Sequence, residues 1–236
     1  LERGDTTLNK MQGSWAGAMG HMQFMPSAFR KYAIDGDNDG KIDLWQSEAD
    51  ALTSAANYLN SIGWLEKERW GRQVKLPENF AFKKVEVDKF YPLAKFKTLG
   101  VTRADGTALS DYKVDAELVL PAGSKGPAFL VYPNFNVIMK WNLSENYALS
   151  VGLLANRIQG AKGLKVNDNT TVDLYKSAEL QALQEKLNTI GYDVGKPDGI
   201  WGPKSRKAIR LYQLQHGLVA DGFPNRQVLM KAEVIG

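Results

Sequence analysis

The chain has 236 residues and a mass of 26.2 kDa, and its 30 basic and 26 acidic residues leave a formal charge of +4. This excess is small and forms no block of like charge, which disfavours a nucleic-acid-binding protein and predicts only a mild preference for anionic polymers. A content of 44% hydrophobic and 24% charged residues excludes intrinsic disorder and collagen-like repeats.

Several other classes are excluded by what the sequence lacks. No apolar run approaches the roughly 20 residues that cross a bilayer, and the first residues lack the pattern of a signal peptide. The absence of cysteine excludes disulfides, a thiol nucleophile and Cys-ligated metals. The two histidines, His21 and His216, lie far apart in sequence, which disfavours a Ser–His hydrolase. Carboxylate chemistry or pure binding is favoured.

The first predicted helix runs from Ser47 to Ile62, with Ser47 as N-cap and Gly63 as the C-terminal stop. Its apolar residues recur at steps of three and four, which predicts one buried face made of Leu52, Ala55, Ala56, Leu59 and Ile62.

A second helical stretch is predicted from about Val137 or Ser144 to Ile158, and the residues on one of its sides are Tyr147, Val151, Leu154 and Ile158. Between the two helices, residues 72–136 hold short apolar runs broken by Pro and Gly, which indicate small strands and turns. The runs are Val85–Val87, Leu118–Leu120 and Phe129–Val131. This region is interpreted as a β-rich insert in a helical domain.

A small separate domain is predicted at the C-terminal end. Residues 161–172 are polar and aperiodic and are interpreted as a linker, with the small domain over 173–236. One helix is indicated by Leu180, Leu183, Leu187 and Ile190, and a second begins at Pro203 and includes Ala208, Leu211 and Tyr212. Asp198-Gly199 and Asp221-Gly222 form a weak internal repeat of turns before helices. Three short helices are expected.

The most informative segment is residues 13–27, GSWAGAMGHMQFMPS. Its three glycines let backbone approach either a packed helix or a ligand, so a tight turn between core helices is an alternative. The segment resembles the signature of the membrane-bound lytic murein transglycosylase B family, S-x-A-G-A-M-G-x-x-Q-F-M-P-S. The likeness continues at 32–45, at 50–64 and at 133–148, and it covers roughly residues 1–160.

This resemblance implies an α+β fold: the C-terminal portion of a mainly helical, lysozyme-like catalytic domain with a small β-rich insert, at about 72–136. It also implies cleavage of the glycosidic bond between N-acetylmuramic acid (MurNAc) and N-acetylglucosamine (GlcNAc) in peptidoglycan, which leaves a 1,6-anhydro end. One carboxylic acid acts as acid and then base, with assistance from the substrate's acetamido group. No cofactor is required.

The catalytic acid of the family is a glutamate in an E-x-x-x-G-type motif upstream of the glycine-rich segment. Glu2 is the sole glutamate before Gly13, and its context does not fit that motif. A terminal, exposed Glu would also lack the apolar surroundings that raise an acid's pKa toward neutrality. No catalytic residue is therefore assigned, and the expected Glu lies upstream of residue 1.

The resemblance also assigns a substrate groove. Ser14 and Gln23 would hydrogen-bond sugar groups, Tyr58 would line the cleft, and its far wall would consist of Trp141, Asn142 and Tyr147. Aromatic faces suit the C–H faces of sugars, and amides suit acetamido groups. Tyr58 and Tyr147 are alternatively core residues, and Trp141 stands where many relatives have Tyr.

The segment DGDNDGKID at 35–43 matches the first nine positions of an EF-hand loop. Position twelve is Gln46, which cannot supply the bidentate carboxylate, so calcium affinity is lowered unless Glu48 or Asp50 takes over. The candidate ligands are Asp35, Asp37, Asp39, Lys41 and Asp50. A structural calcium and a solvated acidic turn are the two interpretations.

Residues 176–232 resemble a peptidoglycan-binding domain of the three-helix type, and a small helical dimerisation unit is the alternative. The candidate wall-contacting residues are Asp198, Trp201, Arg206 and Tyr212.

The two hypotheses are a lytic transglycosylase and, because the acid is absent, a noncatalytic peptidoglycan-binding protein or scaffold. Peptidoglycan glycan strands are the expected partner, with no nucleic acid. A monomer in the periplasm is expected, and membrane attachment would need a lipid anchor outside this chain, at the outer membrane.

Overall fold

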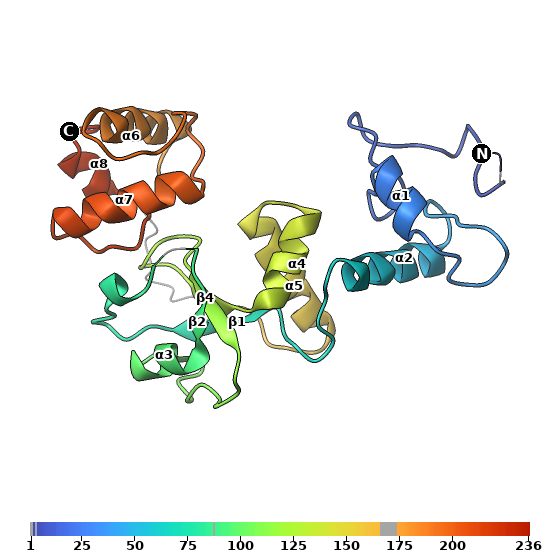
Figure 1. The fold of residues 1–236 in the computed structure, drawn as a ribbon, viewed down its shortest axis with the longest axis horizontal. Coiled ribbons are helices and arrows are strands. Elements are labelled where there is room, and N and C mark those ends of the chain that lie inside the picture. Colours follow the sequence, from blue (N-terminus) through green and yellow to red (C-terminus); the bar gives the residue numbers. More distant parts are fainter. Residues whose placement is uncertain (1, 3, 87, 166–173) are drawn as a thin grey trace. The chain divides into compact units, whose positions relative to one another are not determined.

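The computed structural model describes residues 2, 4–86, 88–165 and 174–236, and it divides into two compact units (Figure 1). The first unit consists of residues 1–68 with 136–142, and the second of residues 69–135 with 143–236. Helix α4 (Pro133–Trp141) contributes to both.

The first unit contains α1 (Pro26–Tyr32), α2 (Glu48–Ser61) and the end of α4, around the buried residues Phe24, Leu44 and Ala51. Ser47 caps α2 as predicted, since its hydroxyl accepts a hydrogen bond from the Asp50 amide at 3.2 Å. The predicted buried face of α2 is wrong in part, because Leu52 is 61% exposed. The buried face includes Asp50, Ala51 and Ser54, and both polar side chains bond the backbone of the preceding loop.

The second unit contains a five-stranded antiparallel sheet in the order β2-β4-β5-β1-β3. Its elements are β1 (Gly71–Lys75), the 3-10 helix η1 (Phe82–Lys84), β2 (Tyr91–Pro92), α3 (Leu93–Thr98), β3 (Thr102–Arg103), β4 (Asp115–Val119) and β5 (Ala128–Val131). Register is set by the pairs Gly71–Val131 and Val119–Phe129. The β-rich insert is confirmed, although Val85 follows η1 in a turn rather than in a strand, and Val87 lies outside the described residues.

Two helices, not one, follow the sheet: α4 ends at Trp141, and α5 (Glu145–Ile158) begins after the N-cap Ser144. The side of α5 that carries Val151, Leu154 and Ile158 is exposed. The buried side consists of Ala148, Leu149 and Gly152. Gly152 lies so close to Trp70 that an added Cβ would be 2.4 Å from the indole ring. The predicted 161–172 linker falls mostly outside the described residues; at its start, Lys165 and Gln73 exchange hydrogen bonds of 2.9 and 2.6 Å.

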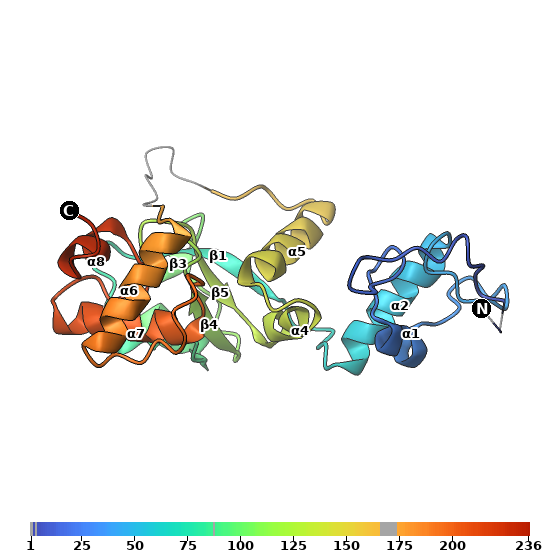
Figure 2. The same ribbon diagram turned by 90° about the horizontal axis from the view of Figure 1, so that it is seen from above.

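The C-terminal region forms the expected three helices, α6 (Ser177–Thr189), α7 (Pro203–Gln215) and α8 (Arg226–Lys231), which Figures 1 and 2 both show beside the sheet. Pro203 is the first residue of α7, as predicted. Leu180, Leu183 and Leu187 are fully buried, whereas Ile190 and Leu211 are exposed.

The weak internal repeat has a structural basis in two buried glutamines. Gln184 on α6 accepts from the Gly199 amide at 2.8 Å and donates to the Asp198 carboxylate at 3.4 Å. Gln213 on α7 makes the same two bonds to the second turn: it accepts from the Gly222 amide at 2.7 Å and donates to the Asp221 carboxylate at 2.9 Å. Each Asp-Gly turn is therefore pinned by a buried glutamine from the preceding helix.

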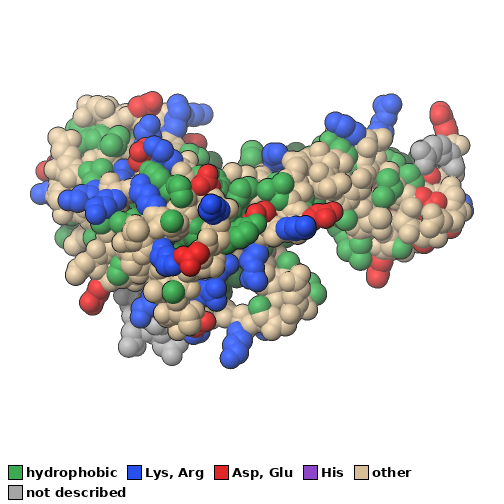
Figure 3. All heavy atoms as spheres, turned by 60° about the horizontal axis from the view of Figure 1, so that its bottom comes forward, with side chains coloured by type: hydrophobic (Ala, Val, Ile, Leu, Met, Phe, Trp, Pro, Cys, Tyr) green, Lys and Arg blue, Asp and Glu red, His purple; other side chains and the backbone are tan. Residues whose placement is uncertain are grey.

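The fold is α+β, as predicted, with helices in both units and one small antiparallel sheet. On the face shown in Figure 3, Lys and Arg side chains lie interspersed with Asp and Glu rather than in one patch. None of the helices in the described ranges is both long and apolar enough to span a membrane.

Candidate functional site: a glycan groove and an acidic loop

The glycine-rich segment folds as a tight loop before α1. The Ser14 amide bonds the Ala18 carbonyl at 2.8 Å, and the Ser14 hydroxyl accepts from the Ala18 amide at 3.1 Å. Met19 forms isolated antiparallel β-bridges with both Gly13 and Phe24. Gly20 has a φ of +65°, and a Cβ there would lie 2.5 Å from the Leu44 carbonyl oxygen. Glycine is therefore required for backbone conformation and for close packing.

An open hollow lies on this loop, lined by Gln12, Gly13, Ser14, Gly20, His21, Gln23 and Trp45. The structure thus brings together two predicted substrate residues, Ser14 and Gln23. Gln23 has a φ of +50°, and its amide nitrogen donates to the Gly20 carbonyl at 3.0 Å. The Trp45 indole donates to the Gln12 carbonyl at 2.7 Å and fixes the rim. Sequence reasoning gave His21 and Trp45 no role in the hollow, although both belong to segments that carry the family resemblance.

Tyr58 and Trp141, two further predicted residues, meet in an aromatic cluster of the same unit. Their ring centroids are 4.9 Å apart and nearly perpendicular, and the Phe24 ring lies 5.6 Å from Tyr58 and 5.5 Å from Trp141. Burial, with a smaller effect from Tyr32, raises the pKa of the Tyr58 hydroxyl, which stays protonated and able to donate near neutral pH. Both rings are half-buried, so they combine core packing with an accessible surface.

The remaining predicted groove residues lie after α4. Asn142 is exposed and belongs to the first unit. Tyr147, in the first turn of α5, is 38% exposed and belongs to the second unit. The core interpretation of Tyr147 does not fit this exposure.

The acidic loop at 35–43 closes on the buried Asp50, whose two carboxylate oxygens accept from the Gly36 and Asp43 amides, each at 2.7 Å. Carboxylate oxygens of Asp35, Asp37 and Asp50 lie within 4.8 Å of one another. Burial would raise the pKa of Asp35, but backbone hydrogen bonds, led by that from Gly40, outweigh it and lower this pKa. The three carboxylates are a donor set that suits a hard cation.

Position twelve of the loop does not face this cluster. The Gln46 side-chain oxygen accepts from the Lys10 ammonium group at 2.6 Å. Glu48 is exposed, whereas Asp50 lies within the cluster. Of the two predicted substitutes for the missing carboxylate, the geometry favours Asp50.

The four predicted wall-contacting residues all make internal contacts. Asp198 accepts from the Ile200 amide at 2.9 Å, and the Trp201 indole donates to the Gly222 carbonyl at 2.9 Å. Tyr212 is buried and stacks on His216 with ring centroids 4.0 Å apart. Arg206 is buried and bonds Glu145 on α5 at 2.6 Å. Burial of Arg206 and Tyr212 argues against direct contact with the wall, because neither side chain is accessible.

Comparisons with known proteins agree with this geometry. A family model described as "Transglycosylase SLT domain" matches residues 1–156, and one described as "Putative peptidoglycan binding domain" matches residues 176–231. The first match spans more than half of the chain, which therefore belongs to the transglycosylase SLT domain family.

Three relatives illustrate this membership. "Membrane-bound lytic murein transglycosylase B" of Escherichia coli is 33% identical over 163 residues, covering 67% of this chain and 42% of that protein. SltB3 from Pseudomonas aeruginosa, solved in complex with NAG-anhNAM-pentapeptide, is 41% identical with a TM-score of 0.88, covering 98% of this chain and 62% of that one. The Escherichia coli lytic transglycosylase Slt35 in complex with calcium is 28% identical with a TM-score of 0.50, covering 63% of this chain and 46% of that one. The chain thus spans less than two thirds of each of these relatives.

Proposed function

We propose that this chain acts as part of a lytic transglycosylase that cleaves the MurNAc–GlcNAc bond of peptidoglycan without water and leaves 1,6-anhydro-MurNAc ends. The observation that carries the proposal is the pairing of Ser14 and Gln23 on one hollow within a matched transglycosylase domain. A matched peptidoglycan-binding domain in the same chain points to the same polymer.

The chain's own residues bind and orient the glycan in this proposal. The Gln23 amide has a second N–H and a free oxygen lone pair to offer an acetamido or hydroxyl group, and the Ser14 hydroxyl has a proton to donate. Tyr58 and Trp141 offer aromatic surface to the C–H faces of sugar rings, and Asn142 adds an amide to the part of the groove that the first unit supplies.

The proton for the leaving oxygen must come from a carboxylic acid held near neutrality. None of the described residues that line the hollow is Asp or Glu. We propose, as the family resemblance implies, that the catalytic glutamate lies upstream of residue 1. A noncatalytic binding protein or scaffold is the alternative, and the absence of such a glutamate from the complete protein would favour it.

The test is substitution in the complete protein. Gln23→Ala is expected to slow release of anhydro-muropeptides from sacculi at least tenfold. The sugar group that the amide would bond loses its partner in the occupied groove, which costs about 1–3 kcal/mol. Asn60→Ala is the control, since Asn60 is an exposed amide on α2 that does not line the hollow. Equal rates for Gln23→Ala and the parent protein would refute the site assignment.

We also propose a structural calcium ion in the acidic loop. Asp35, Asp37 and Asp50 would supply carboxylate oxygens, while Asp39 and Lys41 complete the loop that surrounds them. Both Asp50 oxygens already accept backbone hydrogen bonds, but each keeps a further lone pair for a cation. The ion would neutralise three close carboxylates and stabilise the entry to α2, with no part in bond cleavage.

Calcium is expected to raise the melting temperature of the protein by mass action, and Asp35→Asn is expected to abolish the increase. Asp111→Asn, at an exposed carboxylate of the insert, is the control. An equal increase in the Asp35→Asn protein would contradict the site, and no increase in the parent would contradict the ion.

The substrate places the complete protein in the bacterial cell envelope, and we propose the periplasm, as a monomer. Attachment to the outer membrane would need a lipid anchor beyond this chain.

A further inference from the structure

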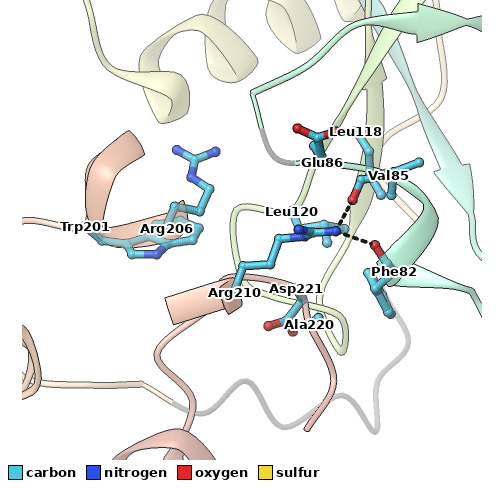
Figure 4. Close-up of a pocket in the computed structure, with 10 residues that line it drawn as sticks. All are labelled: Phe82, Val85, Glu86, Leu118, Leu120, Trp201, Arg206, Arg210, Ala220 and Asp221. Atoms are coloured by element: carbon cyan, nitrogen blue, oxygen red, sulfur yellow. Dashed lines mark hydrogen bonds between the residues drawn. The ribbon is translucent and has the colours of Figure 1, made fainter. Parts of the chain in front are cut away.

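The peptidoglycan-binding domain is joined to the β-rich insert and to α5 by two buried arginines on α7. Figure 4 shows Arg206 and Arg210 reaching from α7 beside the insert residues Phe82, Val85, Leu118 and Leu120. All of these residues belong to the second compact unit, so their contacts lie within one body.

Arg206 makes the first contact. Its guanidinium bonds the Glu145 carboxylate of α5 at 2.6 Å and lies 3.5 Å from Asp88 of the insert. It also lies over the Trp201 ring of its own domain, at 4.7 Å from the centroid. The Arg206 side chain is 8% exposed, so the charge is desolvated by the contact and depends on these carboxylates.

Arg210 makes the second contact, and it uses main-chain acceptors. Its guanidinium donates to the Phe82 carbonyl at 3.0 Å and to the Val85 carbonyl at 2.6 Å. Both bonds come from Nη2, and because its two N–H groups point in fixed directions in the guanidinium plane, they define an orientation as well as a distance.

A third contact lies on the loop after β4. The Ser124 amide donates to Asp221 at 2.8 Å, and Gly123 lies so close to Phe223 that a Cβ would be 2.9 Å from its ring. The domain is thus held at three separate places, which are Glu145 on α5, the residues Phe82, Val85 and Asp88 of the insert, and the loop at 123–124. Three contacts that are not in line fix the orientation of a rigid body.

We propose that Arg206 and Arg210 form a clasp that holds the peptidoglycan-binding domain in one orientation on the insert and α5, and that they act as positioning residues for cleavage of the polymer. The second part rests on the proposed function. A fixed domain presents a bound strand at a constant place relative to the insert and α5, whereas a free domain would sample many orientations.

The clasp is tested by the distance between two spin labels on the full chain. Because the sequence contains no cysteine, Lys113→Cys on the insert and Lys231→Cys on α8, both exposed, would carry the two labels. Electron–electron resonance is expected to give one narrow distance distribution. Arg206→Ala with Arg210→Ala is expected to at least double its width, and Lys204→Ala, an exposed charge on the same helix, is expected to leave it unchanged. A broad distribution in the parent, or an unchanged width in the double variant, would overturn the clasp.

Because unfolding of the domain would also broaden the distribution, a second variant is placed outside it. Glu145→Ala removes the nearer of the two carboxylate partners of Arg206 without changing α6–α8 and is expected to broaden the same distribution. In the complete enzyme, Glu145→Ala and Arg206→Ala are expected to raise KM for sacculi at least fivefold and to leave kcat on a short soluble glycan unchanged. An unchanged KM would overturn the positioning role. A parent enzyme without cleavage would contradict the proposed function instead, since the label distances do not depend on activity.

Discussion

The buried Glu117 on β4 predicts a specific dependence of stability on pH. Its side chain is 9% exposed, and burial raises its pKa from 4.5 to about 7; the Asp88 and Glu145 carboxylates add to the rise, while Arg206 opposes it. The folded protein therefore holds a proton on Glu117 between pH 4.5 and 7 that the unfolded chain releases. The stability that this proton supplies is fully present below about pH 4.5 and is lost as the pH rises through 7.

A rise in pKa from 4.5 to about 7 corresponds to about 3 kcal/mol of folding free energy, since a tenfold change in an ionisation constant is worth about 1.36 kcal/mol. Glu117→Gln keeps the shape of the neutral acid and cannot ionise. We expect the variant and the parent to be equally stable near pH 4.5, and the variant to be more stable by about 3 kcal/mol at pH 8. For a chain of this size, that difference corresponds to a rise in melting temperature of roughly 6–12 °C.

Thermal unfolding followed by near-ultraviolet circular dichroism at pH 4.5, 6 and 8 measures this difference. Glu86→Gln is the control, because the Lys89 ammonium group lowers the pKa of Glu86 and its neutralisation gives no gain at pH 8. Equal melting temperatures of the Glu117→Gln and parent proteins at pH 8 would refute the reasoning, as would a difference that does not vary with pH.

Three further predictions concern the loop, the cation site and the C-terminal core. Gly20→Ala is expected to unfold the glycine-rich loop and to lower the free energy of unfolding, measured by urea titration, by more than about 2 kcal/mol. Gly17 also has a positive φ but open space around it, so Gly17→Ala measures the backbone cost alone, about 1 kcal/mol. Equal losses of stability in the two variants would refute the packing argument. Asp50→Asn replaces one of the two acceptor oxygens by an NH2 group, so one of the Gly36 and Asp43 amides loses its acceptor. We expect a loss of stability of about 1–3 kcal/mol and faster hydrogen exchange at Gly36 and Asp43. Unchanged exchange would contradict this prediction. Leu183→Ala is expected to cost about 2–5 kcal/mol and to abolish binding to sacculi, and retained binding would show that the C-terminal domain does not carry it.

The sequence predicted the order of the elements because local signals marked their ends. Ser47 capped α2, and Pro203 began α7. The burial of helix faces was harder to predict. Leu52 is exposed while Asp50 is buried, because the loop at 34–43 needs polar partners on that side of α2. Periodicity of apolar residues contains no information about such backbone acceptors and donors.

The candidate site was predictable to the extent that it lies in one segment. Ser14 and Gln23 are nine residues apart in sequence and line one hollow. The role of Arg206 was not predictable, since Glu145 is 61 residues away and nothing in either neighbourhood marks the pair. Gln184 and Gln213 were missed for the same reason, because an amide at a helical position resembles a solvated one until the turn that it bonds is known.

We propose that this chain belongs to an enzyme that cleaves peptidoglycan without adding water. The most direct measurement is mass spectrometry of the muropeptides released when the complete protein is incubated with purified sacculi. We expect products that end in 1,6-anhydro-MurNAc. The Gln23→Ala protein is expected to release them at least tenfold more slowly than the parent. Sacculi that are bound but not cut, or products with hydrated reducing ends, would contradict it.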